Sequence, residues 1–221
     1  MELEFTENKN SICGVDEAGR GSLIGPIIVA GISVSKKSLS EMVEIGIKDS
    51  KLLTPNKRQI LFGDVIGLAE SICICRIGIE DIDFHVSKNH LNLLEAEAMA
   101  ITIGNMDSYK IYVDSCDVNP SRYKRTINSF LKRNNTKLIS MHHADRLNVV
   151  VSGASIIAKV IRDSEISKIR LKYGDLGSGY PSDKKTIKFV QEWFEQNREI
   201  PPFARKSWKP AQLILSRTVM Q

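Results

Sequence analysis

The sequence has few of the features that mark fibrous, membrane or exported proteins. Its 221 residues include only 14 glycines and 7 prolines, too few for a collagen-like or linker-like chain. No apolar run approaches the roughly 18 residues that a membrane-spanning helix needs. The polar N-terminus MELEFTENKN lacks the basic and apolar regions of a secretory signal, and we find no internal repeat or low-complexity tract. With 42% hydrophobic residues, the chain is expected to form one globular domain, with or without an appended subdomain.

Neither charge nor cysteine content selects a function. The 31 Lys and Arg against 26 Asp and Glu give a net charge of +5, which favours polyanionic partners only weakly. None of the four cysteines forms the CxxC pair of a zinc or redox site. We therefore expect buried free thiols in a reducing compartment, the cytoplasm, and no membrane association.

The order of apolar and helical patterns predicts an α/β fold. Strands are expected at Ile12–Val15, Ile27–Val34, Ile72–Ile79, Ile111–Val113 and Lys137–Met141. Helices are expected at Pro55–Ala69, Leu91–Ile103, Ser121–Leu131, Val150–Leu171 and Asp183–Glu195. Loops are expected at Ser35–Ser40 and Gly174–Asp183, and a basic connector at Glu199–Lys209 before a short final helix. This order indicates a mixed sheet with a helical C-terminal portion.

The loop GVDEAGRGS, at Gly14–Ser22, follows the first predicted strand. It fails the P-loop pattern, because Arg20 and Gly21 stand where Lys and Ser or Thr are required, and its later glycines are too widely spaced for a dinucleotide fingerprint. Asp16 and Glu17 would also repel a phosphate unless a cation lay between them. A divalent ion such as Mg²⁺ resolves this conflict, because it binds carboxylate and phosphate oxygens together.

Further acids follow two other predicted strands. Asp114 ends the run IYV, and Asp145 follows Leu138–Met141 in HHADRLN. Strand ends that meet at one edge of a sheet would bring these side chains near Asp16 and Glu17. Taken singly, each acid is better explained as a helix cap or a turn former. That explanation weakens because acids follow three short apolar runs, although the sequence does not show that they meet.

The ordered motifs resemble those of type 2 ribonuclease H, the ribonuclease HII family, in its archaeal-like form. They are GVDEAGRG (Gly14–Gly21), DSKLLT (Asp49–Thr54), YVDSCDV (Tyr112–Val118), HADRLNVVVSGASIIAKVIRD (His143–Asp163), GSGYPSD (Gly177–Asp183) and PPFARKSWK (Pro201–Lys209). The resemblance spans nearly the whole chain. It implies an RNase H-like mixed five-stranded sheet flanked by helices, with a catalytic domain at residues 1–173 and a helical extension at 174–221 that contributes to substrate binding.

The resemblance also implies an activity and a set of site residues. Family members hydrolyse the RNA strand of RNA–DNA hybrids and cut on the 5′ side of ribonucleotides embedded in duplex DNA, using two Mg²⁺ or Mn²⁺ ions and leaving 5′-phosphate and 3′-hydroxyl ends. The motif match places the metal-binding, catalytic carboxylates at Asp16, Glu17, Asp114 and Asp145. It places the contacts to ribose 2′-hydroxyls at Gly19, Arg20 and Gly21, the junction-sensing tyrosine at Tyr180, and a phosphate contact at Lys51.

Several positions depart from the family pattern. Ser22 stands where proline usually follows GRG, and Leu52 replaces a usual lysine. His143, Asn148, Val149 and Gly153 also differ from the usual residues. The tail LILSRTVMQ lacks the aromatic pair of a sliding-clamp-binding segment, so we expect no clamp partner and a monomeric protein. Basic residues that could line a nucleic-acid backbone track are Arg20, Lys51, Lys159, Arg162, Lys184, Lys185, Arg205, Lys206 and Lys209.

Three other classes of protein stay open at this point. A non-catalytic hybrid- or RNA-binding protein on the same fold is disfavoured, because acids near phosphates weaken binding unless a metal is present. A different nuclease of the same fold, such as a resolvase or integrase, would differ in its choice of DNA over ribonucleotide-containing duplexes. A nucleotidase would need ATP or GTP binding, which the loop spacing disfavours.

Overall fold

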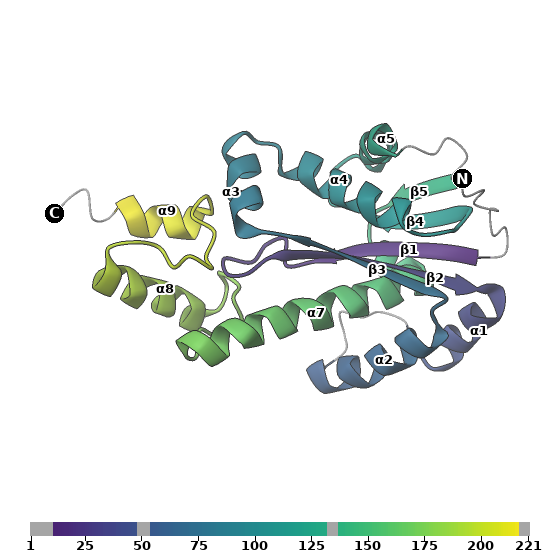
Figure 1. Cartoon of the computed structure of the whole chain (residues 1–221), viewed down its shortest axis with the longest axis horizontal. Coiled ribbons are helices and arrows are strands. Elements are labelled where there is room, and N and C mark those ends of the chain that lie inside the picture. Colours follow the sequence, from purple (N-terminus) through teal and green to yellow (C-terminus); the bar gives the residue numbers. More distant parts are fainter. Residues whose placement is uncertain (1–10, 48–53, 132–136, 217–221) are drawn as a thin grey trace, which may run out of the picture. The chain divides into compact units, whose positions relative to one another are not determined.

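The computed structural model describes residues 11–47, 54–131 and 137–216 (Figure 1). The fold divides into two compact units that alternate along the chain. We call them the sheet unit, made of the described residues of Met1–Ala18, Ile28–Cys75 and Asn92–Val160, and the helical unit, made of those of Gly19–Ile27, Arg76–Leu91 and Ile161–Gln221. This division does not test the predicted functional boundary after residue 173, which stays a prediction.

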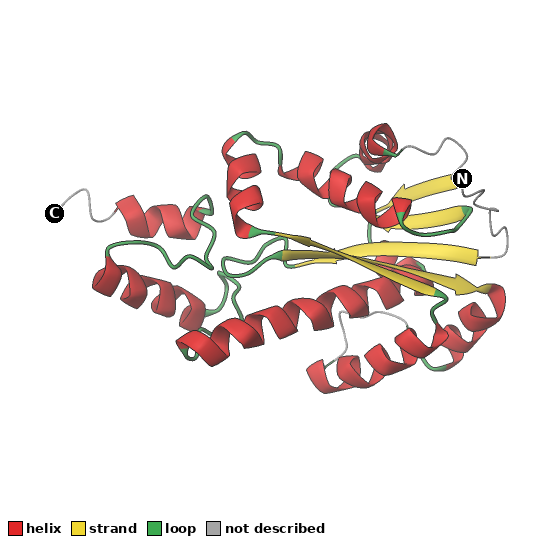
Figure 2. Ribbon diagram, viewed as in Figure 1, coloured by secondary structure: helices red, strands yellow, loops and turns green. Residues whose placement is uncertain are grey.

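The sheet has five strands in the order β3-β2-β1-β4-β5 (Figure 2). Strand β1 is antiparallel to β2 and parallel to β4, and β4 is parallel to β5. The mixed five-stranded sheet flanked by helices that the sequence predicted is therefore confirmed. The strand bounds are Ser11–Ala18 (β1), Ile27–Ser35 (β2), Ser71–Ile77 (β3), Lys110–Asp114 (β4) and Lys137–Met141 (β5).

Helices cover both faces of the central strands, as the burial of nearly every residue of β2 requires. A Cβ added at Gly14 of β1 would lie 2.4 Å from the backbone of Val150, so α7 packs directly on that face. On the opposite face, a Cβ at Gly31 of β2 would lie 2.7 Å from the side chain of Thr102 in α4. Figure 1 shows the two helices on opposite sides of the sheet. Glycine at both positions therefore lets the helices approach the sheet closely.

The helices that the sequence predicted are confirmed, with ends shifted by one or two residues. Three further helices, α1, α3 and α6, were not predicted. The bounds are Lys36–Glu44 (α1), Pro55–Leu68 (α2), Ile79–Ser87 (α3), Leu91–Gly104 (α4), Pro120–Phe130 (α5), Ala144–Leu147 (α6), Val149–Tyr173 (α7), Lys184–Asn197 (α8) and Lys209–Ser216 (α9).

Two local predictions are wrong. The expected loop at Ser35–Ser40 is mostly helix α1, because the Ser35 hydroxyl accepts a hydrogen bond from the Ser38 N–H (3.0 Å) and caps the helix. The third strand ends at Ile77 instead of Ile79, and Ile79 begins α3 after Gly78. Ser35 therefore marks the start of helix α1. The apolar run Ile72–Ile79 is divided between strand β3 and helix α3.

The helical unit has an apolar core of its own. Leu23 and Ile24 are buried there with Ile166 of α7 and Phe203 of the C-terminal connector. The ring of Phe203 lies 4.5 Å from that of Tyr173 and 5.5 Å from that of Trp193. The predicted loop at 174–183 and the predicted connector before α9 both contain no helix among their described residues.

None of the helices in the described ranges is long and apolar enough to span a bilayer. All four cysteines are free thiols, and Cys13 is the buried one among them. The prediction of free thiols is consistent with the structure, but the prediction of burial fits only Cys13.

Candidate active site

Asp16 and Glu17 lie inside β1 and not after it. The strand was predicted to end at Val15 but extends to Ala18. Neighbouring residues of a strand point to opposite faces, so Asp16 shares the face of Gly14 and α7, whereas Glu17 points to the other face. Asp16 is only 4% exposed. The side chains of Asp16 and Glu17 therefore leave β1 toward opposite faces, close to the end of the strand.

Asp114 is the last residue of β4 and is the neighbour of Asp16. The parallel register places Val15 opposite Val113, so the next residue on each strand is an aspartate. Burial raises the pKa of Asp16 well above its ordinary range, and the charge of Asp114 raises it further. The charge of Lys159 and a hydrogen bond from Ser155, both on α7, oppose this rise in the pKa of Asp16. The buried carboxyl of Asp16 is thus held beside the partly buried Asp114, and Lys159 and Ser155 offset part of the rise in its pKa.

Asp145 lies near the end of β4, because the residue before it, Ala144, is hydrogen-bonded to Asp114. Asp114 Oδ1 accepts from the backbone N–H of Ala144 (2.8 Å). His143, with φ of 55°, turns the chain after β5 into the short helix α6, which carries Asp145. Asp145 is 1% exposed and lines a hollow of about 240 Å³ together with Leu147. Asp145 was predicted to lie between a strand and the next long helix, and the structure places it there, in the short helix α6 between β5 and α7.

The described residues contain no group of three or more His, Cys, Asp or Glu side chains placed to hold a metal ion. What the structure shows is a neighbouring pair, the buried Asp16 and the partly buried Asp114, in which burial and then the charge of Asp114 raise the pKa of Asp16. Carboxylate oxygens are the ligands that hard divalent cations prefer, and a cation would remove the electrostatic penalty of ionising both acids. The donor chemistry and the charge of this pair therefore fit a divalent metal.

The Gly19–Gly21 loop follows β1 directly and belongs to the helical unit. Gly19 has φ of +89°, and a Cβ there would lie 2.7 Å from the carbonyl oxygen of Pro26, so the fold itself requires glycine. Gly21 is different: it is exposed, and a Cβ there would meet nothing within 4 Å. The protein's own packing does not explain glycine at Gly21, which leaves open space beside the loop.

Arg205 holds this loop from within the helical unit. Its side chain is fully buried and makes five hydrogen bonds to backbone carbonyl oxygens, including those of Gly19 (2.6 Å) and Arg20 (2.7 Å). Burial and the charge of Arg162 lower the pKa of Arg205 to about 9, so it stays protonated at neutral pH. A role for Arg205 on a nucleic-acid backbone track is therefore wrong. The sequence signal that could have indicated a buried Arg205 is its position between apolar and aromatic residues in PPFARKSW.

Tyr180 lies in the turn between α7 and α8 and is half-buried. The guanidinium carbon of Arg162 lies 4.3 Å from the centre of its ring. Arg162 is 4% exposed, so its predicted place on a backbone track is also wrong. Lys51 and Leu52 lie outside the described residues, so the predicted phosphate contact at Lys51 stays a prediction.

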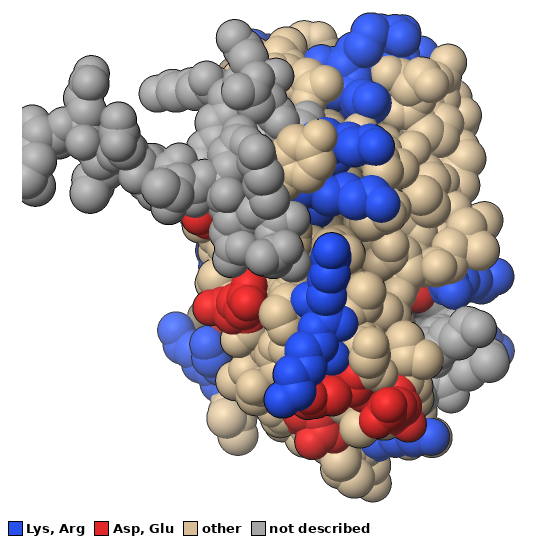
Figure 3. Space-filling view, turned by 90° about the vertical axis from the view of Figure 1, so that its right-hand side faces the viewer, with Lys and Arg blue, Asp and Glu red and all other residues tan. Residues whose placement is uncertain are grey.

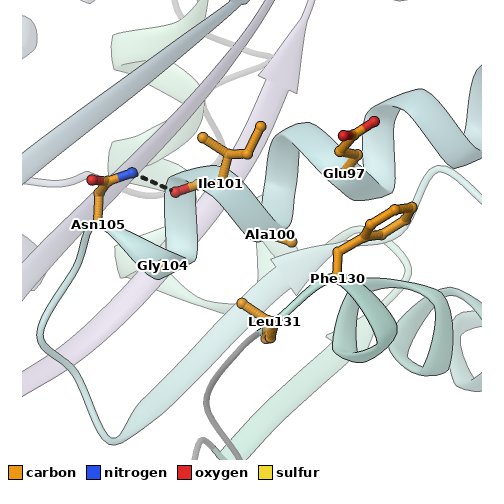
Figure 4. Close-up of a pocket in the computed structure, with 7 residues that line it drawn as sticks. All are labelled: Glu97, Ala100, Ile101, Gly104, Asn105, Phe130 and Leu131. Carbon is orange, nitrogen blue, oxygen red and sulfur yellow. Dashed lines mark hydrogen bonds between the residues drawn. The ribbon is translucent and has the colours of Figure 1, made fainter.

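A second hollow, of about 450 Å³, lies elsewhere in the sheet unit between α4 and α5. Figure 4 shows Ile101 and Phe130 at its wall, with Asn105 donating a hydrogen bond back to the carbonyl oxygen of Ile101 (2.8 Å). Glu97 is the one charged residue among those that line it. The residues that line this hollow include neither Asp16 and Asp114 nor the Gly19–Gly21 loop.

A mixed five-stranded sheet in this order, flanked by helices and with Asp16 and Asp114 on neighbouring parallel strands, has the architecture of the RNase H fold. The family is specified by sequence: the profile of Ribonuclease HII matches residues 13–211. The chain belongs to the ribonuclease HII family. It is accordingly a hydrolytic endonuclease that acts on RNA–DNA hybrids, and its family depends on divalent metal ions.

Relatives of known sequence and structure support this assignment. Ribonuclease HII of Cenarchaeum symbiosum is 44% identical over 203 residues, which cover 92% of this chain and 97% of the relative. The crystal structure of ribonuclease H2 from Pyrococcus horikoshii has 39% identity and a TM-score of 0.87, with 96% of this chain and 100% of that chain covered. RNase HII of Archaeoglobus fulgidus, solved in complex with PCNA, has 34% identity and a TM-score of 0.82, covering 90% and 95%.

Proposed function

We propose that this enzyme, beyond acting on RNA–DNA hybrids, cuts on the 5′ side of a ribonucleotide embedded in duplex DNA. The products would carry 5′-phosphate and 3′-hydroxyl ends. The observation that carries the metal-dependent part of the proposal is that the buried Asp16 and the partly buried Asp114 are neighbours on the parallel strands β1 and β4. A divalent cation would offset the repulsion between the two carboxylates and favour their ionised forms.

The residues that would hold the metal are Asp16, Glu17, Asp114 and Asp145. When bound, a pair of Mg²⁺ or Mn²⁺ ions supplies an activated water and stabilises the departing 3′-oxygen. Asp16 and Asp114 would provide carboxylate oxygens as metal ligands. The backbone N–H of Ala144 donates to Oδ1 of Asp114 and helps to hold this carboxylate in place. Lys159, which donates to Ser155, places a positive charge beside Asp16 and favours its ionised form.

The selection of a ribonucleotide is assigned to the helical unit. The 2′-hydroxyl is the group that separates RNA from DNA, and backbone groups can reach it only where side chains are absent. Gly19, Arg20 and Gly21 would supply those backbone groups, and the open space at Gly21 supports this role. Tyr180 would stack on the neighbouring deoxyribose, and Lys51 would contact a phosphate.

Net surface charge does not locate the substrate. Figure 3 shows an interrupted band of Lys and Arg side chains, with acids gathered toward its lower end, on the face where β1 begins. The carboxylates Asp16 and Asp114 lie at the other end of their strands. We therefore assign the site from the carboxylates and the glycine loop, and not from this band.

The proposed partners follow from the proposed activity. They are RNA–DNA hybrid and ribonucleotide-containing duplex DNA, bound by a monomer in the cytoplasm. The relative from Archaeoglobus fulgidus was solved with PCNA, while the tail of this chain lacks the aromatic pair expected of a clamp-binding segment. Part of that tail, residues 217–221, lies outside the described residues. Absence of a clamp partner stays a prediction.

A cleavage experiment tests the proposal. A duplex with one embedded ribonucleotide is incubated with Mg²⁺, and both product ends are mapped, with a chelator in a parallel reaction. An all-RNA strand paired with DNA is the matched substrate. Cutting of the hybrid without any cutting of the single-ribonucleotide duplex would confine the enzyme to hybrids and contradict the proposal.

A further inference from the structure

Arg162 of α7 links two loops of the helical unit from a buried position. Its Nη2 donates to the hydroxyl of Ser22 (3.0 Å) and to the carbonyl oxygen of Ser178 (2.8 Å). Its Nη1 donates to Asp163 (3.1 Å), and the guanidinium lies against the ring of Tyr180. Ser22 belongs to the glycine loop and Ser178 to the turn that carries Tyr180. One side chain thus contacts both segments to which ribonucleotide recognition is assigned.

The Ser22 contact depends on a departure of this chain from its family. Ser22 is fully buried, and its backbone N–H donates to the carbonyl oxygen of Gly19 (3.1 Å). A proline, the usual residue at this position, has neither that N–H nor a side-chain acceptor. The serine hydroxyl therefore gives Arg162 an acceptor that the usual residue cannot supply. A hydrogen bond to a charged donor is stronger than one between neutral groups.

The two loops are also joined by backbone hydrogen bonds, which fix the turn but not the tyrosine ring. The carbonyl oxygen of Gly179 accepts from the N–H groups of Leu23 (2.8 Å) and Ile24 (3.0 Å). Gly179 has φ of +82°, and a Cβ there would lie 3.0 Å from Nη2 of Arg162, so glycine leaves room for the guanidinium. Rotation about the side-chain bonds of Tyr180 is untouched by these bonds. The packing of the ring against Arg162 is what restricts it.

We propose that Arg162, oriented by Ser22 and Ser178, is a positioning residue that sets the Tyr180 ring and thereby the preference for cutting at a single ribonucleotide. This inference rests on the proposed function, in which Tyr180 stacks on the deoxyribose beside the ribonucleotide. Arg162 itself touches no substrate, because it is buried. Loss of the Ser22 hydroxyl lets the guanidinium shift and leaves the ring in several orientations. Lysine in place of Arg162 cannot stack on the ring and bond both acceptors at once.

The test compares kcat/KM on a single-ribonucleotide duplex with kcat/KM on an all-RNA hybrid. We expect Ser22→Ala to lower the ratio of the two by about tenfold, the effect of losing one hydrogen bond to a charged group. Arg162→Lys should lower the ratio at least as far. Ser167→Ala is the matched control, because that exposed hydroxyl of α7 bonds only to the carbonyl oxygen of Asp163 (2.9 Å) among its described contacts. Its ratio should not change, and thermal unfolding checks that each variant is folded.

A double-mutant cycle separates positioning of Tyr180 from a general structural effect. In a Tyr180→Ala background, Ser22→Ala should change the ratio no further, because the ring through which it acts is gone. An additional fall of the same size in that background would overturn the inference. So would an unchanged ratio in Ser22→Ala and Arg162→Lys while Tyr180→Ala lowers it, and the proposed function would then survive. If Tyr180→Ala itself leaves the ratio unchanged, both the proposed role of Tyr180 and this inference fail.

Discussion

Arg205 donates a hydrogen bond to the carbonyl oxygen of Gly19, 2.6 Å away, from a side chain that is fully buried. The same guanidinium also bonds the carbonyl oxygens of Arg20, Gly25 and Pro26. The conformation of the glycine loop is thus fixed by a residue that lies 186 positions away in the sequence. A loop that reads a sugar through backbone groups needs this kind of support, because Gly19 and Gly21 have no side chains that could hold it.

Replacement of Arg205 should disorder the loop before it affects anything else. We expect Arg205→Lys to lower the free energy of unfolding by about 2–4 kcal/mol, because a lysine cannot serve all of these buried carbonyl acceptors. Chemical denaturation of both proteins measures the change. Lys206→Met, at the exposed neighbouring position, is the control and should unfold like the parent. Equal stability of Arg205→Lys and the parent would show that the arginine does not hold the loop.

Gly19 and Gly21 should respond differently to alanine. Gly19→Ala meets both a positive φ and the Pro26 carbonyl oxygen, so we expect a loss of about 1–3 kcal/mol in the free energy of unfolding. Gly21→Ala has open space and should unfold within about 0.5 kcal/mol of the parent. If the ribose approaches the backbone at Gly21, this variant should still cut hybrids several-fold more slowly. Full activity of a folded Gly21→Ala would place the sugar elsewhere.

The ion pair of Asp117 and Arg122 predicts part of the acid response. Hydrogen bonds from Arg122, the shorter of them 2.6 Å, lower the pKa of Asp117, helped by the N–H of Asn119. A carboxylate whose folded pKa is depressed contributes stability that is complete above its unfolded pKa, near 3.9, and is lost as pH falls through the folded value. We expect Asp117→Asn to lower the Tm by about 2–4 °C at neutral pH. The difference from the parent should shrink as pH falls below 4, and a difference independent of pH would contradict this origin.

Asp114→Asn tests the carboxylate pair directly. Removing this charge should nearly abolish divalent-metal-dependent cleavage of an RNA–DNA hybrid while binding of the hybrid survives, because the acid acts on the metal and not on the duplex. Gel-shift binding and cleavage are measured on the same preparation. Tyr109→Phe, on a half-exposed residue that precedes β4, is the control for substitution near this strand. Full cleavage by Asp114→Asn would remove this residue from the catalytic set.

The sequence was sufficient for the sheet because apolar runs bounded by glycine or charge are a local signal. It was insufficient where one residue type serves two local structures. Ser35 was interpreted as part of a loop, yet its hydroxyl caps α1. Polar Asp16 and Glu17 were expected to end a strand, yet β1 continues through both of them because β2 pairs with each.

The candidate site was predictable in its residues but not in its supports. The four acids and Tyr180 lie in short sequence motifs, which can be recognised without a structure. The roles of Arg162 and Arg205 depend on burial and on contacts between segments far apart in the chain. By composition both looked like surface cations for a phosphate backbone. Only the fold shows that their donors are used on the protein's own carbonyl and hydroxyl oxygens.

The measurement that tests the central claim most directly is the position of the cut in a duplex containing one ribonucleotide. With Mg²⁺ present, the account predicts a single cut on the 5′ side of the ribonucleotide, with a 5′-phosphate on that residue and a 3′-hydroxyl on the preceding deoxynucleotide. A chelator, or Asp114→Asn, should abolish it. A cut on the 3′ side, or cleavage that persists in chelator, would contradict the account.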